Sequence, residues 1–202
     1  MYKLIGTPVA RPFRVLWALE ELGLDYEVVP APPRSDEALQ YNPSGKVPVL
    51  VEDDDIVIDS VAIVQYLADK HGNLTYPAGT IERAKQDSFT QFACDDIDGI
   101  LWTMAKHSFV LPEEIRAQGV RQACEYDFAR SMSALDARLG NNEYVMGDRF
   151  TIPDLIIGHC AGWADNAKFE IPKGNVSDYI KRLRDRPAYQ RSDEIRDSYR
   201  SK

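Results

Sequence analysis

The chain has 202 residues, of which 44% are hydrophobic and 28% are charged, the balance of an ordinary folded globular protein. This length allows one large domain or two small ones, each with a substantial core. The formal net charge of −8 argues against a general binder of nucleic acid or of anionic membranes, because phosphate binding needs clustered Lys and Arg.

The cysteine pattern and the absence of long apolar runs bear on the compartment. Cys94, Cys124 and Cys160 are widely spaced and form no C-x-x-C pair, which excludes a dithiol redox site and a zinc knuckle. We expect them to be small core residues. No apolar run approaches the roughly 20 residues that span a bilayer, and the N-terminus enters a strand without a signal peptide. The sequence therefore predicts a cytoplasmic protein with no membrane partner.

The first 30 residues predict a strand, a helix and a second strand. Residues 2–5 have the composition of a strand, which a Gly-Thr-Pro turn ends. Pro12 suits the first turn of a helix, which Gly23 ends. Residues 26–29 form the second strand. Strand, helix and strand within about 30 residues have the spacing of a parallel βαβ unit.

The next segment predicts a short helix, two strands and a longer helix. The short helix covers 36–41, the strands cover 49–51 and 56–58, and the longer helix begins at Ser60 and is capped by Gly72. Pro48 opens the first of these two strands, where a missing amide does not disturb the ladder. The order of elements, βαβ-α-ββα, predicts a thioredoxin-like fold.

From residue 81 onward the strand signals disappear and only helical periodicity remains. The predicted helices cover 81–107, 113–139, 153–167, 176–184 and a last segment after Pro187. Proline and two acids at 112–114 mark the start of the second helix. Thr151 and Asp154 have the spacing of a capping box, with Asp in place of the usual Glu.

One stretch has the pattern of a peptide-binding edge. A cis Pro48 would aim the backbone carbonyl and amide of Val47 outward, where an extended peptide can pair with them. The ligand's carboxylate would then lie on Ser60 at the positive end of the next helix. The alternative reading is a strand that begins with proline and a serine N-cap, with no ligand.

These same residues carry a family resemblance. The run from Gly45 to Leu50 and the pair Asp59-Ser60 resemble the glutathione-binding half of the cytosolic glutathione transferases, and the likeness covers nearly the whole chain. The resemblance implies a thioredoxin-like α/β domain over 1–75, followed by an all-α helical-bundle domain over 82–202. It also implies a homodimer with apolar side chains at its interface.

The resemblance further implies roles for single residues. Val47, beside a cis Pro48, would pair with the cysteinyl part of glutathione, and Asp59 and Ser60 would hold its γ-glutamyl end. Lys46 or Arg34 would meet the glycine carboxylate. The second substrate would lie against the first long helix of the helical domain, in a pocket lined by Trp102, Lys106 and Phe109, with Met104 and His107 nearby.

The residue that activates the thiol departs from the family pattern. Several classes of the family place Ser, Tyr or Cys in the loop after the first strand, where this chain has Ala10 and Arg11. Three substitutes remain open: the charge of Arg11, the backbone amides from Ala10 to Phe13, and the hydroxyl of Thr7. We expect the next arginine, Arg14, to face solvent or an acidic neighbour.

The function expected from the resemblance is glutathione transfer. Glutathione would be the co-substrate, no metal would be needed, and the enzyme would direct the thiolate at a small electrophile, as in detoxification. Rival functions are a non-catalytic glutathione-binding protein and a glutathione-dependent peroxidase, isomerase, dehalogenase or thiol-lyase. A further rival is a partner-binding module that uses this fold.

Overall fold

The structure is a computed structural model that describes residues 1–200. The chain forms two compact units. Unit 1 contains residues 1–77 together with the C-terminal segment from Arg184, and unit 2 contains residues 78–183.

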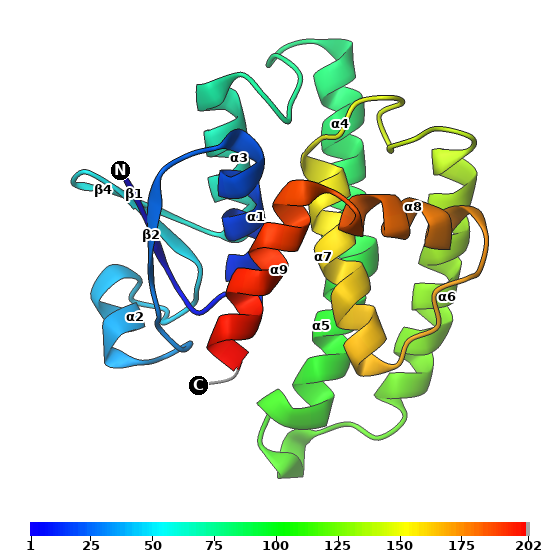
Figure 1. Cartoon of the computed structure of the whole chain (residues 1–202). Coiled ribbons are helices and arrows are strands. Elements are labelled where there is room, and N and C mark those ends of the chain that lie inside the picture. Colours follow the sequence, from blue (N-terminus) through cyan, green and yellow to red (C-terminus); the bar gives the residue numbers. More distant parts are fainter. Residues whose placement is uncertain (201–202) are drawn as a thin grey trace. The chain divides into compact units, whose positions relative to one another are not determined.

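A four-stranded mixed sheet forms the centre of unit 1 (Figure 1). Its strands are β1 (Tyr2–Ile5), β2 (Tyr26–Val29), β3 (Val49–Glu52) and β4 (Asp55–Ile58), in the order β2-β1-β3-β4. β1 runs parallel to β2 and antiparallel to β3, and β3 runs antiparallel to β4. The predicted βαβ unit and the predicted pair of strands after Pro48 are therefore confirmed.

Three helices of unit 1 begin and end where the sequence predicted. They are α1 (Pro12–Leu22), α2 (Asp36–Tyr41) and α3 (Ser60–His71). Gly23 and Gly72 follow α1 and α3 with φ angles of 63° and 65°, in the left-handed conformation that glycine adopts most easily. The side chain of Ser35 caps α2 by accepting the amide hydrogen of Ala38.

The C-terminal helix α9 (Pro187–Arg200) belongs to unit 1 and lies beside α1 (Figure 1). The sequence grouped this helix with the helical domain. Its aromatic ring Tyr189 packs edge-on against Phe13 and Trp17, with ring centroids 5.5 and 4.9 Å away. Apolar contacts with α1 thus decide where α9 packs. Hydrophobic periodicity shows that a helix has an apolar face but not which other helix that face contacts.

Two ion pairs reinforce the contact between α1 and the C-terminal segment. Arg186 donates from Nε and Nη2 to the two carboxylate oxygens of Glu21, at 2.7 and 2.8 Å. The indole N–H of Trp17 donates to the same carboxylate at 2.9 Å. Arg191 donates to Glu20 at 2.7 Å. Bidentate pairing of this kind fixes orientation as well as adding energy.

Helices joined by turns and loops make up unit 2 among the residues described, and Tyr144 and Gly147 form an isolated β-bridge. Its elements are α4 (Ile81–Phe92), η1 (Ala93–Asp98), α5 (Gly99–Ala105), η2 (Lys106–Val110), η3 (Glu113–Ile115), α6 (Val120–Leu139), α7 (Ile152–Ala167) and α8 (Asn175–Arg184). The first four follow one another without a break, and η1 and η2 are π-helical turns within this long helix. π-helical turns often mark functional regions.

The predicted helix start at residue 113 is wrong. Glu113–Ile115 forms only one 3-10 turn, and α6 begins at Val120. Gly119, with φ 80°, precedes α6 in a conformation that interrupts a right-handed helix. Proline followed by two acids, the signal that predicted a helix start, therefore produced a single 3-10 turn here and no continuing helix.

The predicted capping box is present at the start of α7. Asp154 is fully buried and accepts four hydrogen bonds. They come from the amides of Val145 and Thr151 and from the hydroxyls of Thr151 and Tyr179, at 2.8 to 3.0 Å. Burial raises the pKa of Asp154 to about 6, although all four donors act in the opposite direction. The box therefore ties α7 to two other segments of unit 2.

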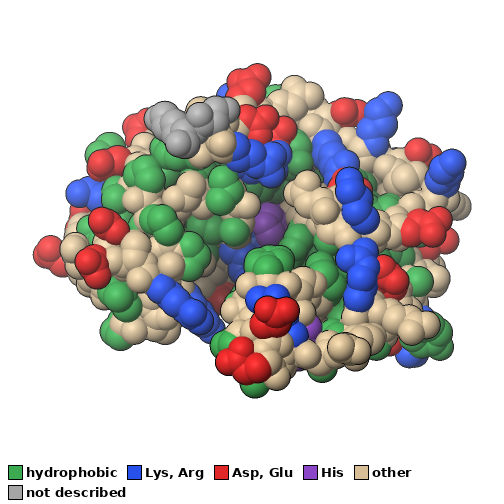
Figure 2. Space-filling view, turned by 90° about the horizontal axis from the view of Figure 1, so that it is seen from below, with side chains coloured by type: hydrophobic (Ala, Val, Ile, Leu, Met, Phe, Trp, Pro, Cys, Tyr) green, Lys and Arg blue, Asp and Glu red, His purple; other side chains and the backbone are tan. Residues whose placement is uncertain are grey.

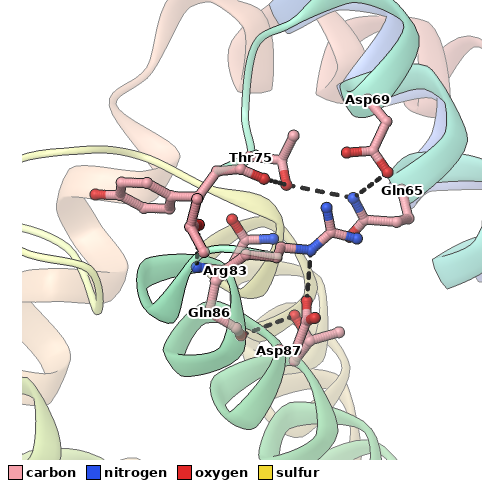
Figure 3. A network of polar contacts seen from close by, with 9 residues as sticks. Gln65, Asp69, Thr75, Arg83, Gln86 and Asp87 are labelled. Carbon is pink, nitrogen blue, oxygen red and sulfur yellow. Dashed lines mark hydrogen bonds and ion pairs between the residues drawn. The ribbon is translucent and has the colours of Figure 1, made fainter. Parts of the chain in front are cut away.

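Polar contacts also fix the end of unit 1 and the first turns of unit 2. Gln65 on α3 donates to Asp69 at 2.9 Å and to Thr75 at 3.3 Å, which holds the segment after α3 (Figure 3). Within α4, Arg83 donates to Asp87 at 2.9 Å (Figure 3).

Among the described helices, none is both long and apolar enough to cross a membrane.

Candidate functional site

The loop between β1 and α1 lies against Val47, which brings together two segments that the sequence assigned to one site. Gly6 has φ 129°. A Cβ atom at this position would lie 2.8 Å from Pro12 Cγ and 2.9 Å from Val47 Cβ. Only glycine allows such a close approach, so Gly6 sets the distance between the loop and Val47.

Thr7 and Arg11 both lie in this loop and are half-buried. The backbone of Thr7 is bonded on both sides: its amide donates to the Ala31 carbonyl at 3.3 Å, and its carbonyl accepts the Val9 amide at 2.8 Å. Its hydroxyl has no hydrogen-bond partner among the residues described. Arg11 is the residue before α1, and its side chain does not cap the helix.

The expectation that the amides from Ala10 to Phe13 are available is wrong for Phe13. The Phe13 amide donates to the Ala10 carbonyl at 2.9 Å, the Arg14 amide donates to the Arg11 carbonyl at 3.0 Å, and Pro12 has no N–H. The remaining donors of the segment are the amides of Ala10 and Arg11. That of Ala10 has no acceptor within residues 1–200. The segment therefore provides fewer amides than its four residues suggest.

Val47 and Pro48 form the inner edge of the candidate site. The bond between them is cis, the state that the family resemblance implied. The side chain of Val47 packs against a small core cluster that includes Ile5, Ala31 and Val49. In the part of the chain that the structure describes, no hydrogen bond to its amide or carbonyl is seen. The side chain is thus fixed, while the backbone donor and acceptor stay available.

Lys46 and Arg34 are both exposed. They come from two segments whose backbones are in contact. The Arg34 amide donates to the Gly45 carbonyl at 2.8 Å, and a Cβ on Gly45 would lie 2.9 Å from the Arg34 Cα. The side chain of Asn42 is buried and donates to the Lys46 carbonyl at 2.9 Å. Asn42 thereby anchors the segment that leads to Val47.

Asp59 and Ser60 form the start of α3, and Asp59 is its N-cap. Asp59 Oδ1 accepts the amides of Val61 and Ala62 at 2.9 and 3.2 Å, and the Asp59 carbonyl accepts the Ile63 amide at 2.9 Å. A helix start ordinarily leaves its first amides unbonded, but here Asp59 accepts most of them. Of the first four, only the Ser60 amide has no acceptor among the described residues.

Arg14 does not face solvent, so that part of the expectation for it is wrong. Its side chain is 2% exposed, and Nη1 donates to Ser60 Oγ at 3.3 Å. Nothing in the sequence indicated this contact, because it joins residues 46 positions apart. The apolar neighbours of Arg14 in α1 (Phe13, Val15 and Leu16) could have indicated that this helix is buried on all sides at its start.

The residues expected to line the second-substrate pocket lie on α5 and η2 of unit 2. Trp102 is 36% exposed and Phe109 is 67% exposed, so neither is a core residue. Lys106 is half-buried. It lies four residues after Trp102 and three before Phe109, a spacing that places the three side chains on one side of a helix. Met104 is buried. His107 is held by the Ala117 amide, which donates to Nδ1 at 3.0 Å.

One group of side chains within residues 1–200 has the spacing to hold a metal ion. Asp98, His159 and Cys160 have ligand atoms within 4.8 Å of one another. Cys160 is buried, and its thiol donates to Asp98 at 3.8 Å, so hydrogen bonding already accounts for this arrangement. Cys124 is also buried, as the sequence expected, and burial raises the pKa of its thiol.

Three segments of unit 1 thus meet at the first turn of α1. Gly6 brings the loop with Thr7 and Arg11 against Val47, and Arg14 connects the same turn to Ser60. The arrangement presents a backbone donor and acceptor at Val47, donors at Ser60 and basic side chains at one end. It can hold an extended peptide with a carboxylate at each end.

Comparison with known proteins agrees with this geometry. Residues 6–75 match the family model described as glutathione S-transferase, N-terminal domain, and residues 100–187 match the one described as glutathione S-transferase, C-terminal domain. The chain is 30% identical over 155 residues to glutathione transferase GST 23 of Zea mays. The aligned region covers 74% of this chain and 66% of the maize protein, a little under two thirds.

Solved structures show the same fold. A glutathione transferase from Methylococcus capsulatus str. Bath superposes with a TM-score of 0.85 at 26% identity and covers 98% of this chain and 100% of that one. A theta class glutathione S-transferase from Xanthomonas axonopodis pv. citri, solved with glutathione bound, gives a TM-score of 0.77 at 25% identity. It covers 95% of this chain and 96% of its own.

Proposed function

The chain belongs to the glutathione S-transferase family, and on that premise we propose that it binds glutathione along Val47 and transfers it to an electrophile. The family match supports the glutathione transferase function expected from the sequence. The individual roles given below for its residues are our proposal.

The observation that carries this proposal is the meeting of three segments at the first turn of α1. Val47 would exchange two backbone hydrogen bonds with the cysteinyl residue, because its amide and carbonyl have no other partner among the residues described. Asp59 and Ser60 would bind the γ-glutamyl end. The exposed Lys46 or Arg34 would meet the glycine carboxylate.

The thiol would lie at the loop that contains Thr7 and Arg11. A free thiol has a pKa of about 8.5, and a nearby positive charge or amide donor lowers it. The Ala10 amide, the Arg11 guanidinium and the Thr7 hydroxyl are the donors that support this step. The second substrate would lie against Trp102, Lys106 and Phe109, whose exposed apolar and cationic surface suits an electrophile with an apolar body.

A non-catalytic glutathione-binding protein is the second candidate, and the loop supports it. Ala10 has no hydroxyl or thiol, and most of the neighbouring amides are bonded within the chain. Such a protein would bind glutathione without lowering the pKa of its thiol. A dedicated peroxidase, isomerase or dehalogenase would instead show weak activity with general aromatic electrophiles and efficient turnover of one substrate.

We further propose a cytoplasmic homodimer that acts in detoxification. Ile56 and Ile58 on the edge strand β4 are 49% and 48% exposed, and an exposed apolar edge favours a partner. Acidic and basic side chains are intermingled on the face drawn in Figure 2, which fits a protein that does not bind nucleic acid.

Calorimetry with glutathione tests the proposal directly. Binding heat with micromolar to millimolar affinity is expected, together with thiolate absorbance of the bound peptide at neutral pH. Bound glutathione whose thiol pKa stays near ~8.5 would identify a binder without catalysis. Absence of any binding heat and of retention on a glutathione resin would refute the proposed function.

A further inference from the structure

A carboxylate, an imidazole and a thiol converge in unit 2, and none of them is among the residues assigned above to glutathione. Asp98 is the last residue of η1, and His159 and Cys160 are neighbours in α7. The long helix that contains η1 packs beside α7 (Figure 1). The ligand atoms of the three side chains all lie within 4.8 Å of one another. Residues as far as 62 positions apart in the chain thus supply one group of metal-binding atoms.

The distances within this group are close to those of a tetrahedral zinc site. Zn–S bonds are ~2.3 Å and Zn–N or Zn–O bonds ~2.0–2.1 Å, so at tetrahedral angles the ligand atoms lie roughly 3.3–3.5 Å apart. The Cys160 sulfur is 3.8 Å from Asp98 Oδ1. Since every pair lies within 4.8 Å, each has to close by at most about 1.5 Å. Rotation of the half-buried side chains of Asp98 and His159 supplies a movement of this size.

The three side chains also have the chemistry that zinc prefers. Thiolate and imidazole ligands select Zn²⁺ over Mg²⁺ and Ca²⁺, which take oxygen ligands. The Asp98 carboxylate and a Cys160 thiolate together carry two negative charges, which one divalent cation neutralises. This balance matters because Cys160 is fully buried, and burial of an unpaired thiolate is costly.

The contact between Cys160 and Asp98 prepares the group for an ion. The thiol donates to the carboxylate at 3.8 Å, a long hydrogen bond from a weak donor. This bond holds sulfur and oxygen side by side, as an ion between them would. When a metal ion binds, a metal–sulfur bond replaces the S–H bond and the proton leaves to solvent. The exchange gives up one weak hydrogen bond and gains three bonds to the ion.

The backbone at Asp98 is a second, independent indication. η1 is a π-helical turn, in which the Gly99 amide donates to the Cys94 carbonyl five residues back. Such a turn holds one residue more than an α-helical turn, which changes the direction of the side chains around it. π-helical turns are rare within α-helices and occur frequently at functional sites. The turn therefore favours a role for Asp98 beyond packing.

We propose that Asp98, His159 and Cys160 bind one divalent transition-metal ion of the zinc class. Cys160 binds as the thiolate, His159 through a ring nitrogen and Asp98 through a carboxylate oxygen. The ion ties η1 to α7, and three protein ligands leave a fourth position for water or a small anion. The proposed glutathione transfer does not use this ion, so failure of either proposal leaves the other untouched.

Cobalt spectroscopy on the full chain tests the site directly. Co²⁺ takes the tetrahedral positions of zinc, and its bond to a thiolate gives a charge-transfer absorption. Wild-type protein is expected to bind one Co²⁺ per chain with this absorption, and Zn²⁺ should displace the Co²⁺. Zn²⁺ itself should bind with a Kd of about 1 μM or tighter. Excess Mg²⁺ or Ca²⁺ should leave the absorption unchanged, because neither prefers sulfur or nitrogen ligands.

Variants identify the ligands. Cys160→Ser should abolish the cobalt–thiolate absorption. His159→Gln and Asp98→Asn should each weaken Zn²⁺ binding about tenfold or more in competition with a coloured chelator. The matched control is the double variant Cys94→Ser, Cys124→Ser, which leaves Cys160 as the last of the three cysteines and should keep the full absorption. Circular dichroism of each variant without metal checks that it folds.

The possible outcomes are distinct. Wild-type protein without cobalt–thiolate absorption overturns the inference, and so does absorption that disappears in the Cys94 and Cys124 double variant. Zn²⁺ affinity that is the same in wild type, His159→Gln and Asp98→Asn shows an adventitious ion only and also overturns it. Should Cys160→Ser fail to fold, the two variants at half-buried positions and the double variant still decide the result.

Discussion

Replacement of Asp154 by alanine should destabilise unit 2 more than any exposed change in α7. The side chain is fully buried and accepts four hydrogen bonds, two of them from the amides of Val145 and Thr151. Each buried donor left without a partner costs about 1–3 kcal/mol. With two amides and the Tyr179 hydroxyl orphaned, we expect a loss of about 4 kcal/mol in the free energy of unfolding. That is a large part of the roughly 5–15 kcal/mol available to a domain.

The same residue predicts a pH dependence. Burial raises the folded-state pKa of Asp154 from 3.8 to about 6. Between these values the folded state binds more protons than the unfolded state, so stability falls as pH rises through the window. The shift of about two units corresponds to roughly 3 kcal/mol at neutral pH. Asp154→Ala lacks this group, so its deficit relative to wild type should be larger at pH 5 than at pH 7.

Urea unfolding followed by circular dichroism at several pH values between 4.5 and 7.5 measures both effects. Asn166→Ala, an exposed change on the same helix, is the control and should shift stability by less than about 0.5 kcal/mol. The reasoning is refuted if Asp154→Ala costs less than about 1 kcal/mol, or if its deficit is the same at pH 5 and pH 7.

Four further changes test the site and the packing of unit 1. Arg11→Ala should return the pKa of bound thiol toward ~8.5, as thiolate absorbance would show; an unchanged value leaves the loop amides as the activating group. Lys46→Ala should weaken glutathione binding about fivefold in calorimetry but leave γ-glutamylcysteine unaffected, and equal losses would contradict its role at the glycine carboxylate. Glu21→Gln breaks the ion pair with Arg186 and should lower the free energy of unfolding by about 3 kcal/mol in urea titrations. A loss below ~0.5 kcal/mol would show that the pair does not stabilise the fold. Ile58→Glu should give a monomer in light scattering, and a persistent dimer would exclude β4 from the interface.

Most elements were predictable because their signals are local. The strands, the helices of unit 1 and the capping box follow from hydrophobic periodicity and from Gly, Pro and Thr at their ends. The family was also readable from two short motifs, Gly45 to Leu50 and Asp59-Ser60, and the family models confirm it. The failed start at Glu113 shows the limit of such signals, because one glycine six residues later decided where α6 begins.

The state of each donor in the candidate site was not predictable. The starts of α1 and α3 were expected to offer backbone amides to a ligand. The Asp59 side chain and the carbonyls of Asp59, Ala10 and Arg11 accept hydrogen bonds from most of these amides. Whether an amide is available depends on what lies within 3 Å of it, and periodicity contains no such information. The roles of Thr7, Arg11, Lys46 and the other site residues accordingly remain predictions for measurement.

By itself the sequence determined the order and type of the elements, the position of Pro48 before β3, and the family to which the chain belongs. Only the tertiary structure placed α9 against α1 and buried Arg14 beside Ser60, contacts that join residues far apart in the chain. The physical reason is that helix and strand signals come from neighbours along the backbone. The environment of a charged side chain comes instead from whichever segments fold against it.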